Sequence, residues 1–344
     1  MESTSRQSRV DEYVRKLQPL FDPNACDGIN QTFEFVCSLV RVGGVELGDL
    51  DPFNESQALV QDLIALSHVP QASESFPKPD RTRARLAIMS YCHLTEVGFF
   101  YQLLANLLRV RSGKRFHFDP FRDLWIRRKR GDPIPPSTTT KIRRVVQLAT
   151  ECGFTGLDEI FNDIYQKDIR NAVFHADYAL TETDFVMRNK GLYKSRKGYL
   201  TPAIEFDELE DLIDRSFAFY SALLSLHNGA RSTFRPFQNK LLPFDPHYKG
   251  LLELLFEDSV LSGFHVYWPN GSHCEFSRTK EGTRASNLHP SIKGGIELFV
   301  GLYASNRGPF SPLVEHDQEP HYTPRQGWTR APHWPEDLKP YDAE

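Results

Sequence analysis

Residues 166–180 read QKDIRNAVFHADYAL, and the spacing of the apolar side chains in and before this stretch predicts an amphipathic helix. The helix is expected to begin near residue 155 and to run to about Tyr178. At about 100° per residue, five side chains share one helix face: Phe161, Tyr165, Ile169, Ala172 and Ala176. This face is predicted to pack against the protein core.

The other faces of this helix carry Arg170, Asn171 and His175. Asn171 and His175 are four residues apart, so they stack on one flank. Arg170 lies about 140° around the helix from His175 and reaches the same place only through the length of its side chain. Phe174 falls among charged residues opposite the core face. An aromatic residue there predicts a second buried surface, made by a neighbouring segment or by another subunit.

This polar pattern has a structural and a chemical interpretation. A surface Arg, a polar Asn and a helix-terminal His stabilised by the helix dipole need no further function. The spacing alone is not specific, because a second Arg-x4-His runs from Arg284 to His289. Its Ser, its Asn and the following Pro290 predict a loop. An Asn directly after the Arg, within a helix, is the rarer combination.

The residues before this helix are also predicted to be helical. Three amphipathic patterns open the chain: residues 10–21, 29–42 and 55–67. Asn54 is a candidate N-cap for the third, and the Pro- and Ser-rich residues 69–80 predict a linker. Residues 81–111 are apolar on more than one face, which predicts a single central helix of a bundle. A further helix is expected from Ser137, as N-cap, to about Cys152.

After the motif the pattern becomes mixed. Residues 184–205 predict a β-hairpin with turns at 189–191 and 196–198, and an amphipathic helix then runs to a stop at Asn228–Gly229. The C-terminal part is predicted to be mixed α/β or rich in loops. Its expected elements are a short helix near 248–257, a hairpin turning at Asn270–Gly271, and a loop or packed tail over 305–344.

The Arg170-Asn171-x-x-x-His175 stretch resembles the motif of the HEPN superfamily, whose ribonuclease members carry Arg, a polar residue and His on one helix of a small bundle. The order of helices and hairpin over residues 81–229 is similar too. The resemblance implies a mainly α, HEPN-like bundle with a small hairpin (81–229), between an N-terminal helical region (1–80) and a C-terminal accessory region (230–344). His93 and Glu96, on the preceding helix, are possible cleft residues, although a structural role suits them as well.

The resemblance also implies a homodimer in which two motif helices meet, with Phe174 at the interface. RNA supplies its own nucleophile in the 2′-OH. His175 would transfer protons, Arg170 would stabilise charge on the phosphate, and Asn171 would orient His175 or the phosphate. The chain departs from the family at Tyr178, a possible cleft residue: related toxins that an antitoxin adenylylates often have Tyr two residues after the His, whereas Tyr178 is three after it.

The formal net charge of −4 excludes a generally basic surface, so any RNA contact must come from local clusters. The candidates next to Trp125 and in the following helix are Arg127, Arg128, Lys129, Arg130, Lys141 and Arg144. Further cations lie in the predicted hairpin 184–205. Such runs form either a surface that follows the RNA backbone or an ordinary solvated face.

No cofactor or metal is predicted. Five scattered cysteines make neither a disulfide framework nor a cysteine zinc site, and the histidines at 265, 273, 316, 321 and 333 match no tight ligand spacing. Gly-rich phosphate loops and a nucleophile elbow are missing from the sequence. No long apolar run or leader sequence is found, so we expect a cytoplasmic protein that does not bind membranes.

Two functional hypotheses follow. The first is a metal-independent HEPN endoribonuclease that cleaves tRNA or single-stranded RNA, acting as a toxin or antiphage effector under an antitoxin or a phage-derived trigger. The second is a non-catalytic HEPN-like module that binds a nucleotide, RNA or a protein partner, in which Arg170 and His175 are structural.

Overall fold

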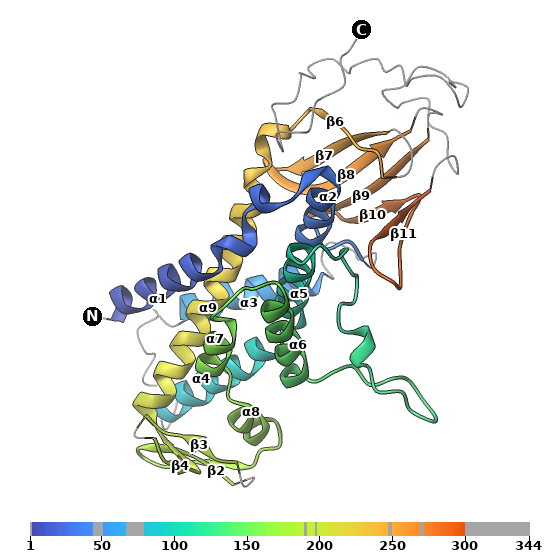
Figure 1. The fold of residues 1–344 in the computed structure, drawn as a ribbon. Coiled ribbons are helices and arrows are strands. Elements are labelled where there is room, and N and C mark those ends of the chain that lie inside the picture. The colour runs from blue at the N-terminus through green and yellow to red at the C-terminus, as the bar shows by residue number, and fades with distance from the viewer. Residues whose placement is uncertain are drawn as a thin grey trace. The chain divides into compact units, whose positions relative to one another are not determined.

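The computed structural model describes residues 2–43, 51–66, 79–188, 191–196, 198–246, 250–268 and 272–299. These residues form helices and several small antiparallel sheets, so the structure is mixed rather than mainly α (Figure 1). Two compact units are built from alternating segments of the chain. The first takes Met1–Leu17, Pro52–Tyr101 and Leu124–Ser225; the second takes Gln18–Asp51, Gln102–Asp123 and Leu226–Glu344. The division into three consecutive domains stays a prediction.

The first unit contains most of the helices, together with the early residues of α5 and most of α9. Its helices are α1 (Glu2–Leu17), α3 (Pro52–Leu66), α4 (Pro79–Glu96), α5 (Gly98–Arg111), α6 (Thr138–Glu151), α7 (Leu157–Ile164), α8 (Lys167–Phe174) and α9 (Phe206–Thr233). The Ser137 N-cap of α6 is confirmed, because its hydroxyl accepts from the Thr140 amide. Asn54 is not an N-cap, since α3 begins two residues earlier. The predicted linker lies largely outside the described residues.

The single central helix predicted over 81–111 is wrong, because α4 ends at Glu96 and α5 starts at Gly98. The Tyr101 hydroxyl donates to the Thr95 carbonyl at 2.8 Å, and a continuous helix would need that carbonyl for the amide four residues on. The Val97 amide instead bonds the Leu94 carbonyl at 3.2 Å, a tighter turn that closes α4.

The motif helix is also interrupted, between α7 and α8. Tyr165 and Gln166 have extended backbone angles. Two side-chain hydroxyls take over the helical hydrogen bonds lost there: Tyr91 accepts from the Gln166 amide at 2.8 Å, and Ser216 donates to the Ile164 carbonyl at 2.9 Å. The prediction of one helix from about 155 to Tyr178 is therefore wrong, because these partners compensate the break.

Two small sheets follow α8 in the first unit. β1 (Tyr178–Leu180), β2 (Asp184–Met187) and β5 (Ala203–Glu205) form a three-stranded sheet in the order β1-β2-β5, and β3 (Tyr193–Lys194) pairs with β4 (Leu200–Thr201). Strand pairing across the predicted hairpin is thus confirmed, but Tyr178 begins a strand instead of ending a helix. Asn189, Lys190 and Lys197, at the predicted turns, lie outside the described residues.

The second unit has a five-stranded antiparallel sheet in the order β10-β9-β8-β7-β6. Its strands are β6 (Leu241–Pro243), β7 (Leu251–Glu257), β8 (Val260–Tyr267), β9 (His273–Thr279) and β10 (Gly282–Ser286). Helix α2 (Gly28–Leu39) packs on it, with the Phe33 ring 4.8 Å from that of Phe264 between centroids. A short pair, β11 (Leu288–Pro290) and β12 (Ile296–Leu298), completes the unit.

The C-terminal part of the chain differs from its prediction at two of three places. The helix near 248–257 is wrong: residues 251–257 form β7, because Asp258 and Ser259 adopt left-handed angles and turn the chain into β8. The β8–β9 hairpin is confirmed by the pairing of Tyr267 with His273, while its turn at Asn270–Gly271 lies outside the described residues, as do Tyr248 and the tail. The loop predicted for Arg284–His289 is instead carried largely by β10 and β11.

Helix α9 continues four residues beyond its predicted stop at Asn228–Gly229. The residues after Gly229 include the buried Ala230, and Phe234 just beyond the helix is buried as well. Burial of apolar side chains on both sides of Gly229 outweighs the modest helix penalty of one glycine.

Candidate functional site

Helix α8 carries the Arg-Asn-x-x-x-His stretch and packs against α4 in the first unit. Ile169 and Ala172 are buried there, as their spacing predicts. Arg170 Nε donates to Glu96 Oε1 at 2.8 Å, which joins the last residue of α4 to the middle of α8. Both side chains are 30% exposed. Water therefore screens the ion pair in part, and its contribution to stability is on the order of 1 kcal/mol at most.

Arg170 has two further neighbours on its own helix. Its Nη1 donates to Asn171 Oδ1 at 2.9 Å, and its Cζ lies 4.8 Å from the centroid of the Phe174 ring. A guanidinium has five N–H donors in a fixed fork. The two hydrogen bonds use one donor on Nε and one on Nη1, so the fork is held in place with donors left over for an anion.

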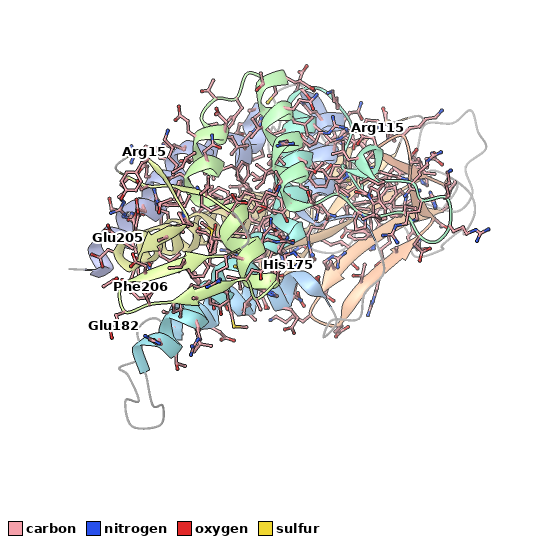
Figure 2. The ribbon with its side chains drawn as sticks, turned by 90° about the horizontal axis from the view of Figure 1, so that it is seen from below. Arg15, Arg115, His175, Glu182, Glu205 and Phe206 are labelled. Carbon is pink, nitrogen blue, oxygen red and sulfur yellow. The ribbon has the colours of Figure 1, made fainter. Side chains whose placement is uncertain are left out.

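His175 lies at the C-cap of α8, beyond the last helical residue (Figure 2). Ala176 follows with φ of 55°, its amide bonds the Val173 carbonyl at 3.1 Å, and the Asp177 amide bonds the Ala172 carbonyl at 2.8 Å. This is the Schellman arrangement, in which a left-handed residue closes a helix. Ala176 is exposed, so its predicted place on the core face is wrong. The backbone of His175 is therefore held in place, while its imidazole ring is open to solvent.

The structure brings some predicted site residues together and leaves others apart. Glu96, Arg170, Asn171 and Phe174 form one contiguous group through the contacts above. Asn171 directs its side-chain oxygen to Arg170, and its backbone carbonyl accepts from the His175 amide at 3.0 Å. The His175 ring is exposed and makes no hydrogen bond or ion pair with another residue in the described parts of the chain.

The other two cleft candidates have separate positions. His93 is exposed in the last turn of α4, one turn before Glu96. Tyr178 begins β1, and its ring stacks on Phe185 of β2 with centroids 5.1 Å apart. Stacking within the sheet gives Tyr178 a packing role.

Sequence reasoning missed a group of tyrosines around Glu96 and the start of α8. Tyr91 holds the break before α8, Tyr165 hydrogen-bonds Thr139 at 3.1 Å, and the Tyr101 and Tyr220 hydroxyls are 3.1 Å apart. Burial raises the pKa of Tyr165, and the Glu96 carboxylate adds to this rise. These phenols therefore stay neutral at physiological pH. Tyrosines scattered over four segments leave no spacing signal in the sequence.

The cysteine beside the ion pair is inert for a similar reason. Burial raises the pKa of Cys92 to about 12, even though the positive charge of Arg170 acts in the opposite direction. A thiol with that pKa is not a nucleophile at neutral pH. Cys92 is therefore a core residue.

Three large apolar side chains on α8 and α4 are exposed. Phe174 is 55% exposed, and Leu86 and Met89, on the solvent-facing side of α4, are each 58% exposed. At helical spacing, Leu86 and Met89 share one face of α4 with His93, and His93 lies one turn before Glu96. Sequence analysis had identified Phe174 only, because the apolar residues of α4 occur on more than one face.

The predicted RNA-binding cations lie in two neighbouring segments. Arg127–Arg130 are all exposed, in a loop closed by reciprocal backbone hydrogen bonds between Ile126 and Ile134, each 3.0 Å. Lys141 and Arg144 lie in the first turns of α6, with intermediate exposure. Arg144 bonds Gln147 on the same helix.

His265 of β8 and His273 of β9 lie on one face of the five-stranded sheet. His265 Nδ1 is 3.1 Å from Glu253 Oε2 and Nε2 is 3.5 Å from Glu275 Oε2. Burial disfavours the charged ring, but the interactions with the two carboxylates outweigh it and raise the pKa of His265 to about 9. Within the described residues there is no group of three or more His, Cys, Asp or Glu side chains placed to hold a metal ion.

Comparisons with protein-family models, with curated proteins and with solved structures gave no match for this chain. A search of the helices in the described part of the chain found none with the length and apolar character needed to cross a membrane.

Proposed function

We propose that this protein is a metal-independent endoribonuclease of the HEPN type, with Arg170, Asn171 and His175 as its site. The observation that supports the proposal is the arrangement of side chains at the end of α8. There an oriented guanidinium with spare donors and a solvent-accessible imidazole occur within two turns of one helix, beside the exposed ring of Phe174. A phosphate-binding cation and a side chain that can transfer protons are what RNA cleavage by its own 2′-OH requires.

The proposed reaction needs proton transfer and charge stabilisation. His175 would take the proton of the attacking 2′-OH or give one to the leaving 5′-oxygen. Arg170 would bind the phosphate oxygens as negative charge builds up on them, through charge-assisted hydrogen bonds. Asn171 would act by holding Arg170, given its hydrogen bond to Nη1. The products would be a 2′,3′-cyclic phosphate and a 5′-OH.

A second copy of the chain would complete the site. One imidazole cannot act as both base and acid at opposite ends of the scissile bond in a single step, whereas two copies bring two. The exposed Phe174 of α8, with the exposed Leu86 and Met89 of α4, provides apolar area that a homodimer would bury. Its burial would bring the two α8 helices together.

The biological setting in the proposal comes from the resemblance. HEPN ribonucleases act as toxins and abortive-infection effectors, and we place this chain among them, in the cytoplasm where tRNA and mRNA are found. An antitoxin or a phage-derived trigger would control it. The displaced position of Tyr178, now in a sheet, argues against control by adenylylation at that residue.

A non-catalytic HEPN-like module is the second candidate. The observation in its favour is that Glu96, Asn171 and Phe174 already surround the Arg170 guanidinium, as they would around an arginine that links two helices. In that case α8 would be a structural helix and the exposed surface would bind a nucleotide, RNA or a protein.

The test is cleavage of labelled tRNA and a mixed-sequence single-stranded RNA in excess EDTA. Wild type is compared with His175→Ala and Arg170→Ala, and with a control carrying Arg284→Ala and His289→Ala, which removes the other Arg-x4-His. Cleavage by wild type and the control alone supports the enzyme. Cleavage that survives in both α8 variants refutes the assigned site. RNA binding without cleavage by any of the chains favours the module.

A further inference from the structure

Residues 125–134, here called the basic arm, form a narrow loop just before α6 (Figure 1). The Ile126–Ile134 bridge closes its base, with 3.0 Å hydrogen bonds in both directions. Gly131, with φ of 87°, and Pro133 shape the return of the chain. The bridge holds the two ends of the loop together. Residues 127–132 between them form the tip of the arm.

The tip of the basic arm concentrates positive charge on an acidic protein. Four consecutive cations, Arg127–Arg130, and one carboxylate, Asp132, give the tip a net charge of +3, against −4 for the whole chain. All five side chains are exposed. The four cations make no hydrogen bond or ion pair with other residues in the described part of the chain. Their charge is therefore available to a polyanion.

Trp125 and Ile126 lie at the base of the basic arm, 38% and 61% exposed respectively. A large aromatic ring left partly in water next to arginines is the usual platform on which an unpaired base stacks. In a duplex the bases stack on one another and cannot use such a ring. The combination of arginines with an exposed indole therefore favours a single strand over a duplex.

We propose that the basic arm is a binding site for single-stranded RNA, separate from α8 and independent of RNA sequence. The guanidinium forks of the tip contact backbone phosphates, and Trp125 stacks on one base. The inference deepens the proposed function by naming its substrate class and the element that captures it. The arm would set affinity, while the end of α8 would carry out cleavage.

Counterion release gives the size of the expected effect. For single strands the logarithm of the binding constant falls with the logarithm of salt concentration by about 0.7 per phosphate contact. Four contacts therefore contribute a slope of about 2.8, which is roughly a 50-fold loss of affinity between 50 and 200 mM salt. Loss of base stacking on Trp125 corresponds to roughly a 5- to 150-fold weaker complex.

The experiment measures the anisotropy of a labelled 15-nucleotide 2′-O-methyl RNA of mixed sequence, which lacks the 2′-OH and cannot be cleaved. Full-length wild type is compared with a variant in which Arg127, Arg128, Lys129 and Arg130 are changed to Gln, and with Trp125→Ala and Trp125→Phe. A control variant loses the same charges, three Arg and one Lys, at exposed positions elsewhere: Arg15→Gln, Arg235→Gln, Arg284→Gln and Lys293→Gln.

The proposal predicts that the slope of log binding constant against log salt concentration is smaller by about 2.8 in the arm variant than in wild type. Trp125→Ala should weaken binding, and Trp125→Phe should bind like wild type. The control variant should also bind like wild type. Equal loss in the arm and control variants would show a general charge effect and overturn the proposal. Tighter binding of the matching duplex, with no effect of Trp125→Ala, would overturn the single-strand assignment. Binding only to phosphatidylserine vesicles would identify a membrane site instead.

His175→Ala separates this inference from the proposed ribonuclease. If the arm binds RNA but no chain cleaves it, the arm stands and the ribonuclease fails. If cleavage depends on His175 while the arm variant keeps the KM of wild type, the ribonuclease stands and the arm fails.

Discussion

Two histidines of the second unit should make its stability depend on pH in opposite directions. His227 in α9 is 1% exposed, and its Nε2 donates to the Leu39 carbonyl at 2.8 Å. Burial, reinforced by the nearby Arg231, lowers the pKa of His227 to about 3. His265, between Glu253 and Glu275, has its pKa raised to about 9.

The sign of each effect follows from proton linkage. Below pH 6.5 an unfolded His227 binds a proton that the folded ring refuses, so stability falls as pH falls from 6.5 towards 3. His265 contributes stability that is complete below 6.5 and is lost as pH rises through 9. At about 1.36 kcal/mol per pH unit, the free energy of unfolding falls by about 2 kcal/mol within 1.5 pH units on either side of pH 6.5. The fall below pH 6.5 is called the acid limb, and the fall above it the alkaline limb. The free energy of unfolding should therefore peak near pH 6.5.

Urea denaturation at pH 5.0, 6.5 and 8.0 measures both limbs. His227→Gln keeps a donor for the Leu39 carbonyl but cannot titrate, so it should make the acid limb smaller and leave the alkaline limb intact. His265→Gln should do the reverse. An acid limb that is unchanged in His227→Gln would refute the assignment. The range stops at pH 5.0 because carboxylates with lowered pKa, such as Asp211 and Glu275, add to acid sensitivity at lower pH.

Three single substitutions test the packing around α8, each by the free energy of unfolding in urea. Ala176→Gly should raise it by about 0.5–1 kcal/mol, because glycine adopts the left-handed angle without the steric cost that alanine has. Tyr91→Phe should lower it by about 1 kcal/mol, since it leaves the partly buried Gln166 amide without its acceptor. Glu96→Gln should lower it by at most about 1 kcal/mol, because the ion pair with Arg170 is partly solvated.

Matched controls are available on the surface of the same unit. Ala179→Gly in the exposed part of β1 should destabilise the protein, opposite in sign to the change at the end of α8. Tyr199→Phe, at a side chain that is 52% exposed, and Glu182→Gln, at an exposed loop position, should both leave the free energy of unfolding unchanged. A loss in Tyr199→Phe equal to that in Tyr91→Phe would show that the Tyr91 hydroxyl has no special role.

Local spacing predicted the helices whose apolar faces are regular. Helix α6 agrees with its prediction to within one residue at its C-terminus, and Ile169 and Ala172 are buried as expected. The break at Tyr165–Gln166 could not be predicted, because the hydroxyls that compensate it belong to Tyr91 and Ser216, which are distant in sequence. At Val97 the compensating hydroxyl belongs to Tyr101, and its bond to the Thr95 carbonyl leaves no spacing signal. Tertiary contacts decide where such helices end.

The C-terminal strand β7 was mistaken for a helix for a different reason. Its sequence LLELLFE is a short apolar run that fits a buried strand and a helix equally well. Pairing with β8, through a turn at Asp258 and Ser259, settles the choice. The bridge at the base of the basic arm was missed because Ile126 and Ile134 are single residues in a Pro-rich segment.

The residues of the candidate site could be named from the sequence, but their arrangement in space could not. Its members on α8 are visible in the sequence, and Glu96 was among the cleft candidates. That Arg170 bonds Glu96 and Asn171, and that His175 ends the helix with a free-standing ring, follows only from how α8 packs on α4. The tyrosines around Glu96 have no sequence signature.

The chemistry of the RNA ends tests the central claim most directly. A 5′-labelled single-stranded RNA is incubated with the protein in excess EDTA, beside His175→Ala and a fully 2′-O-methylated strand. We predict fragments with 2′,3′-cyclic phosphate and 5′-OH ends from wild type acting on RNA, and none in the other two reactions. Fragments with 5′-phosphate ends, cleavage of the 2′-O-methyl strand, or full activity in His175→Ala would contradict the proposed mechanism.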